Sequence, residues 1–156
     1  MKRAFFIFAL AACAAAHGDL LKSPMDWKPV QTNEIARWKA ENSAPKGVVA
    51  DKSARTVRFL AEATGIGADE TVEFLAIGPL SDRAYESMFV TVASPAAIAA
   101  ACEEIGLPLG KGVDPVAARF WPLGEKVTMS VKAWGKNAAS RPSGTITAFL
   151  KDERAA

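Results

Sequence analysis

Apolar and polar residues alternate along much of the chain, and this pattern predicts strands. The clearest case is residues 126–134, where the apolar positions Val127, Met129, Val131 and Ala133 point one way and polar residues point the other, as in a half-buried strand. Further strands are expected at 56–63, 71–77, 84–92 and 145–150. A polar turn at 78–83 opens with Gly-Pro and predicts a hairpin between 71–77 and 84–92.

One stretch has the pattern of a helix with both ends marked. Ser94 suits the N-cap and Pro95 suits the first helical position, whose N–H is unpaired in any helix. Gly106 is expected to end this helix. Its apolar face follows the i, i+3, i+4, i+7 spacing through Ile98, Ala101, Cys102 and Ile105. The predicted fold class is α+β, with about five mostly antiparallel strands and one main helix, Pro95 to Ile105, packed on the sheet.

The N-terminus has the three parts of a secretory signal. Lys2 and Arg3 precede an apolar stretch, which ends in small residues at 14–16. The stretch is shorter than the roughly 20 apolar residues that span a bilayer. We therefore expect residues 1–16 to be an export signal, and the protein to be periplasmic or anchored in the cell envelope.

The signal has two candidate cleavage sites. Residues 10–13, Leu-Ala-Ala-Cys, resemble the lipobox of bacterial lipoproteins, which would make Cys13 the lipid attachment site and limit the signal to 1–12. A lipidated Cys13 would anchor the protein to a membrane, each buried CH₂ contributing about 0.8 kcal/mol. The alternative is cleavage after Ala16, with His17 as the first mature residue.

Residues 17–50 form a lead-in segment with three prolines and little periodicity, and residues 51–156 form the α+β domain. Two helical turns are expected at 34–40. Trp27 and Trp38 are expected to anchor the lead-in segment to the domain; the alternative is that they form a partner-binding surface.

Charge changes the picture once the signal is set aside. The full chain carries 19 basic and 17 acidic residues, but removal of Lys2 and Arg3 leaves 17 of each. A nucleic-acid binder would be expected to show a basic excess on one face. The mature chain is neutral and its charges are interspersed, so no nucleic-acid partner is expected.

The catalytic inventory is small. His17 is the only histidine and lies at the signal exit, so histidine catalysis and the usual zinc sites are not expected within the domain. Cys102 lies on the apolar helix face and is expected to pack in the core, the alternative being a reactive thiol. Two cysteines cannot supply the four thiolates of most iron–sulfur clusters. We expect no metal and no other cofactor.

Four segments together resemble the YdjY-type domain, an exported bacterial family of uncharacterised function: 72–75, 85–91, 94–98 and 102–110. The resemblance covers about 48–150 and consists of strands and turns. Because the family domain usually continues past the position of Leu150, the resemblance implies a C-terminally shortened member. It also implies an α+β fold without a catalytic signature.

Tyr85 and Glu86 are the family-like element expected to contact a ligand or partner; otherwise they are an edge packing residue and a solvated acid. The leading interpretation is a binding or accessory module that recognises an unknown envelope protein or small ligand. The alternative is a hydrolase or lyase that uses Tyr85 with carboxylates from Glu70, Glu73 and Glu86, since paired carboxylates at a set separation can cleave glycosidic bonds. A pocket gathering Glu73, Tyr85 and Glu86 would favour the enzyme, and a flat face would favour the binding module.

Overall fold

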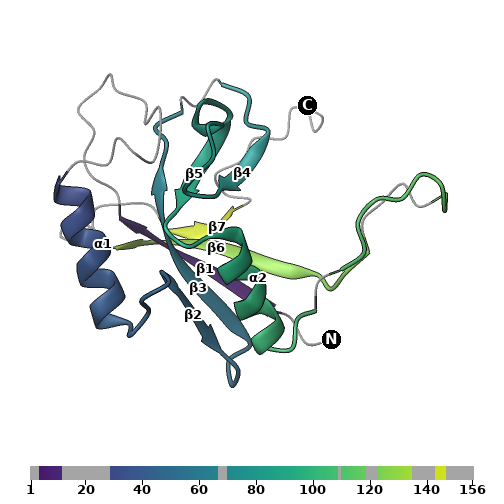
Figure 1. The fold of residues 1–156 in the computed structure, drawn as a ribbon, viewed down its shortest axis with the longest axis horizontal. Coiled ribbons are helices and arrows are strands. Elements are labelled where there is room, and N and C mark those ends of the chain that lie inside the picture. Colours follow the sequence, from purple (N-terminus) through teal and green to yellow (C-terminus); the bar gives the residue numbers. More distant parts are fainter. Residues whose placement is uncertain are drawn as a thin grey trace.

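A computed structural model of the chain describes residues 4–11, 29–66, 70–108, 110–118, 123–134 and 143–146 (Figure 1). The elements run in the order β1 (Ala4–Ala11), α1 (Pro29–Glu41), β2 (Val48–Asp51), β3 (Thr56–Ala63), β4 (Phe74–Ile77), the 3₁₀ helix η2 (Ala84–Glu86), β5 (Ser87–Thr91), α2 (Pro95–Glu104), β6 (Val127–Trp134) and β7 (Gly144–Thr145). The predicted α+β class, with a helix packed on a sheet, is confirmed. Among the described helices, none is long and apolar enough to cross a membrane.

The sheet is mixed. Its strand order is β4-β5-β3-β1-β6-β7, and β2 pairs with β3 beside this path. The pairs β1–β3, β1–β6 and β4–β5 are parallel, whereas β2–β3, β3–β5 and β6–β7 are antiparallel. The sheet therefore has more parallel pairing than the sequence pattern led us to expect. Strand β1 joins two smaller sets of strands, β2–β5 and β6–β7.

The predicted hairpin between 71–77 and 84–92 is wrong, because β4 and β5 run parallel, with Phe74 opposite Ser87 and Ile77 opposite Val90. The residues at 84–86, expected to open the second strand, form η2 instead. The chain thus returns to the starting end of β4 before β5 begins. Two contacts hold this arrangement: the Thr91 hydroxyl donates to the Ile77 carbonyl at 3.1 Å, and the Glu73 amide donates to the Glu86 carbonyl at 2.9 Å.

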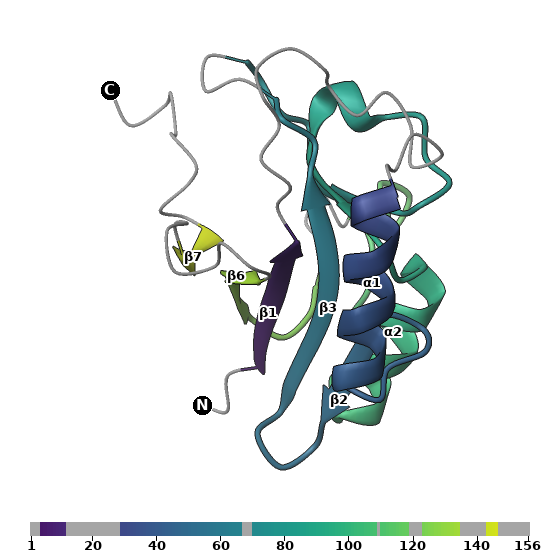
Figure 2. The same cartoon turned by 90° about the vertical axis from the view of Figure 1, so that its left-hand side faces the viewer.

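Strand β3 supplies the main core. Its alternate residues Val57, Phe59 and Ala61 are buried in one cluster with Ala101, Cys102 and Ile105 of the α2 region, so the predicted apolar faces of both elements are confirmed. The intervening residue Leu60 belongs to a second cluster, with Trp38 of α1. Because successive side chains of a strand point to opposite sides, β3 is buried on both. Figure 2 shows α1 and α2 beside β3.

The predicted ends of α2 are confirmed. The Ser94 hydroxyl accepts the Ala97 amide at 3.2 Å and caps the helix, while Pro95 fills the first position. At the other end Gly106 has φ +75°, a conformation that favours glycine. The Gly106 amide donates to Glu103 and the Leu107 amide donates to Cys102, both at 2.9 Å, which is a Schellman motif.

Helix α1 is longer than the two turns expected at 34–40 and occupies a large part of the predicted lead-in segment. Trp38 is buried, which confirms its predicted role as a packing anchor. Next to it, Arg37 lies 4.4 Å above the ring of Trp134 and forms an ion pair of 2.6 Å with Glu34. This cation–π contact links α1 to β6.

Several expectations lie partly or wholly outside the described residues, including those for the signal exit at 14–16 and for His17. Trp27, Cys13 and the end of the predicted last strand at 147–150 belong there. Residues 4–11 of the expected signal are described as β1. Their place in the sheet does not test whether residues 4–11 are removed from the mature protein, so the export signal stays a prediction.

Substitution of Trp38 by alanine should destabilise the protein by about 3–5 kcal/mol, because it empties a fully packed site between α1 and β3. Leu80→Ala is the matched control, since Leu80 is 95% exposed and its loss should change the free energy of unfolding by less than about 0.5 kcal/mol. Urea denaturation of both variants measures the difference. Equal effects would show that α1 does not depend on this contact.

The turn between β2 and β3 predicts a pH dependence. Asp51 accepts hydrogen bonds from the Ala54 amide at 2.9 Å and the Ser53 hydroxyl at 2.7 Å, and these bonds lower the pKa of its carboxyl below the ordinary 3.8. Since the folded pKa is the lower one, this contribution to stability is complete above pH 3.8 and is lost as the pH falls through the folded value. An NMR titration of Asp51 should have its midpoint below 3.8, and Ser53→Ala should move that midpoint upward. A wild-type midpoint at or above 3.8 would contradict this account.

Candidate functional site

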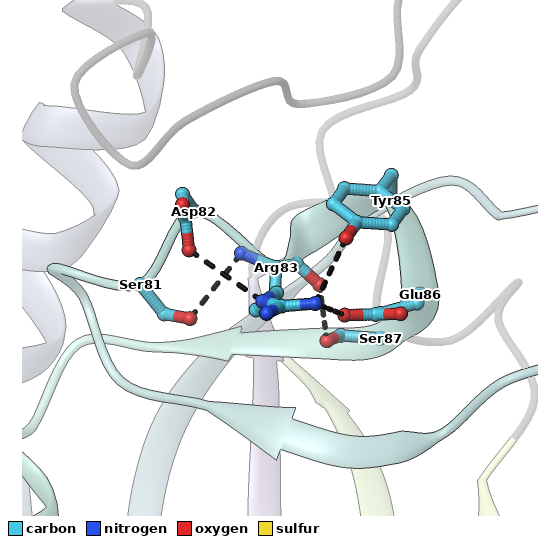
Figure 3. A network of polar contacts seen from close by, with 6 residues as sticks. All are labelled: Ser81, Asp82, Arg83, Tyr85, Glu86 and Ser87. Carbon is cyan, nitrogen blue, oxygen red and sulfur yellow. Dashed lines mark hydrogen bonds and ion pairs between the residues drawn. The ribbon is translucent and has the colours of Figure 1, made fainter.

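Residues 81–87, which we call the Arg83 turn, lead from β4 into β5. Their polar side chains form a network (Figure 3). Arg83 lies at its centre. Its Nη1 donates to the Tyr85 hydroxyl at 3.0 Å and to Glu86 Oε1 at 2.8 Å. On the other side of the guanidinium, Nε lies 3.8 Å from Asp82 Oδ1. These contacts join the two predicted site residues, Tyr85 and Glu86, through a third residue that the sequence did not single out.

The backbone of the turn is also held. The Ser87 hydroxyl donates to the Arg83 carbonyl at 2.5 Å, and the Ser81 hydroxyl accepts the Arg83 amide at 3.3 Å. The Ser81 amide in turn donates to the Gly78 carbonyl at 3.1 Å. Arg83 is therefore fixed at both ends, through its main chain and through its guanidinium.

Beneath the polar network lies a small apolar cluster of Ala84, Ile77 and Val90. Ala84 is the residue of η2 that enters it, and the buried Thr64 of the segment after β3 donates to the Ser87 carbonyl at 2.5 Å. The turn is thus built on the sheet and not on a free loop. Binding residues placed on such a support keep their geometry before a partner arrives.

Exposure separates the members of this network. Tyr85 is 60% exposed, although large aromatic side chains are usually buried, and Arg83 is half exposed. The side chain of Glu86 is only 14% exposed. Hydrogen bonds from Arg83 to Glu86 and Tyr85 raise the pKa of the guanidinium further, so Arg83 is a fixed cation at any physiological pH. The turn presents to solvent an aromatic ring and an arginine that is paired with Glu86 and with the exposed Asp82.

Of the three carboxylates named for the alternative, hydrolytic interpretation, Glu86 is the one that belongs to the Arg83 network. Glu73 precedes β4 and is exposed, and its main-chain amide is the group that meets Glu86. Glu70 is exposed before it. The carboxylate of Glu86 is engaged by Arg83. The described contacts therefore bring Tyr85 and Glu86 together and leave the side chain of Glu73 on the exposed side of its segment.

The structure also has an exposed apolar surface that the sequence pattern did not predict. Residues 110–118 and 123–126 extend away from the sheet as an arm (Figure 1), and Lys111 and Leu123 pair across it through two hydrogen bonds of 2.7 and 2.8 Å. Gly110 is required there, because a Cβ at this position would meet the Leu123 carbonyl oxygen at 2.1 Å. Large apolar side chains on the arm are exposed, namely Val113, Val116 and Leu123. Valines within a Gly- and Pro-rich loop were the signal available in the sequence.

The remaining chemistry of the described residues is sparse. Cys102 is buried in the main cluster, as predicted, and burial together with the charge of Glu103 raises the pKa of its thiol. Within the described ranges, no group of three or more His, Cys, Asp or Glu residues could hold a metal ion.

Comparison with known proteins returned no relative: no family model, no curated protein and no solved structure matches this chain. The YdjY-type resemblance therefore stays a prediction.

Cys102 should react slowly with a thiol reagent in the folded protein, because it is buried and its raised pKa keeps the thiolate scarce. The control is Ser53→Cys, which places a thiol on the exposed turn after β2. We expect the engineered thiol to be labelled at least about tenfold faster than Cys102 at pH 7.5, and the two rates to converge in 8 M urea. Similar rates without urea would mean that α2 opens readily.

Proposed function

We propose that this protein is an exported binding module of the bacterial cell envelope, and that it contacts its partner or ligand through the Arg83 turn. The observation that carries the proposal is the exposed Tyr85, whose hydroxyl is held by Arg83 beside Glu86. Export rests on the N-terminal signal, and anchoring through Cys13 is part of the proposal for the lipobox exit. The YdjY-type resemblance implies the same exported class.

Tyrosine and arginine are the residues most often found at the energetic centre of interfaces, since each offers a large contact surface and a directed polar group. Tyr85 has only two side-chain torsions, and its hydroxyl is already fixed. Ordering a side chain on binding costs about 0.5–1.5 kcal/mol, so a ring that is held in advance avoids part of this cost.

Two more exposed apolar side chains lie close to the Arg83 turn in the chain. Phe74 begins β4, where it is paired with Ser87, and Leu80 precedes the turn. An interface needs apolar contact area around its polar anchors. Phe74 and Leu80 add such area.

A carboxylate-based hydrolase would make a different demand. Its acid or base must reach the substrate within hydrogen-bonding distance. Glu86 is mostly covered and is bonded to Arg83, while Glu73 is exposed and paired through its main chain. This arrangement supports a recognition surface better than a catalytic pair.

In-cell photo-crosslinking tests the proposed contact. A photoreactive amino acid in place of Leu80 should yield a discrete adduct, and one in place of Lys52, on the turn between β2 and β3, should not. Tyr85→Ala in the Leu80 background should abolish most of the adduct, while Tyr85→Phe, which keeps the ring, should retain more of it. Arg83→Ala frees the tyrosine and should weaken binding about two- to tenfold, the equivalent of one ordered side chain.

Val116→Ala is the control, because Val116 is also an exposed apolar side chain but lies on the arm. An adduct that survives Tyr85→Ala and disappears with Val116→Ala would move the contact from the Arg83 turn to the arm. The intact mass of the protein purified from cells tests export in the same experiment. It distinguishes a chain that begins at His17, a chain that begins at a lipidated Cys13, and a chain that keeps residues 1–16.

A further inference from the structure

Strand β1 occupies the centre of the sheet and is the element that joins its two parts. It runs parallel to β3, with Phe5 opposite Thr56 and Leu10 opposite Ala61. It also runs parallel to β6, from Ala4 opposite Val127 to Ala11 opposite Trp134. In the strand order of the described residues, β3 and β6 meet only through β1.

The residues of β1 are the ones that export would remove. Cleavage before Cys13 and cleavage after Ala16 both take away residues 4–11. The mature protein would then contain β2–β5 and β6–β7, and the sides of β3 and β6 that face β1 would each be left without a pairing strand. Unpaired backbone N–H and C=O groups are costly wherever water cannot reach them, so these two edges are receptive to a new strand.

From these observations we propose that removal of the signal opens a strand-binding slot between β3 and β6, and that the mature protein fills it with an extended apolar segment of another polypeptide. The inference rests on the export part of the proposed function and is independent of the Arg83 turn. Addition of a peptide strand to an exposed sheet edge is an established mode of recognition, in which main-chain hydrogen bonds supply affinity.

The flanking strands define what the slot accepts. Val57, Phe59 and Ala61 are buried on one side of β3, and Leu60 is buried on the other. On β6, Val131 and Ala133 are buried. Next to them, Ser130 is half-buried and Lys132 is exposed, so a strand in the slot is covered on the face that it shares with Val131 and Ala133. The occupant is therefore about eight residues long, apolar at least at alternate positions and parallel to both neighbours, as Ala4–Ala11 is.

The chain's own next residues are poorly suited to replace β1. Residues 17–27 include the charged Asp19, Lys22 and Asp26 as well as Pro24. Proline cannot donate to a central ladder, and charged side chains are disfavoured on a face that packs on the core. A strand from another polypeptide is the better occupant.

Amide hydrogen exchange on the mature protein tests the slot. The probe is a synthetic peptide of residues 2–11, in which Lys2 and Arg3 provide solubility. The matched control is the same peptide with Ile7→Pro, which removes one ladder donor from the middle of the strand. We expect the probe to slow exchange at least tenfold in 56–61 and 127–134, and the control peptide to leave it unchanged.

The other outcomes of these measurements also support or overturn the slot. Slow exchange in both segments before the peptide is added would mean that a second copy or the same chain already fills the gap. This result would overturn the proposal. Equal effects of the two peptides overturn it as well. If the mature protein is unfolded alone, recovery of its tryptophan fluorescence with the probe, and not with the control, supports the slot, and no recovery overturns it. An intact mass that includes residues 4–11 would overturn both export and the slot. A cleaved protein that does not bind the peptide would overturn only the slot.

Discussion

The burial of β3 on both of its sides is the constraint on which the rest of the structure depends. This strand pairs with β1, β2 and β5, so its backbone connects three neighbours. Its alternate side chains enter two different clusters, one with α2 and one with Trp38 of α1. Since both helices pack against it, the position of each is set by the register of one eight-residue strand.

The Arg83 turn shows how this framework positions a surface feature. Ala84 packs with Ile77 and Val90, and Thr64, directly after β3, bonds to the carbonyl of Ser87. These contacts fix the turn from below, while the guanidinium of Arg83 fixes Tyr85 and Glu86 from the side. The exposed tyrosine is therefore a rigid group on a rigid support, which is the property that makes it suited to recognition.

Residues 4–11 satisfy two sets of physical requirements at once. An export signal needs a short apolar run after a basic start. A central strand also favours apolar residues, because a face of it packs on the core. The sequence meets both, which explains how one segment can be predicted as a leader and also complete the sheet. The proposed slot between β3 and β6 follows from this double role.

The local elements could be predicted from the chain itself. Helix α2 has its N-cap and its C-terminal glycine within thirteen residues, and β3 and β6 have clear alternation, so these three were found with bounds within one residue of those observed. Tyr85 and Glu86 were also predicted as contact residues, and their contact role stays a prediction. Arg83 was not, since its role comes from hydrogen bonds that form only once η2 brings the three side chains together. The direction of β4 relative to β5 was beyond the pattern as well, because parallel and antiparallel strands show the same alternation. The amino-acid sequence by itself thus determined the ends of α2 and the buried faces of α2 and β3, which depend on neighbours a few residues away. Only the tertiary structure decided strand direction, strand order and the Arg83 contacts, because these depend on which distant segments meet.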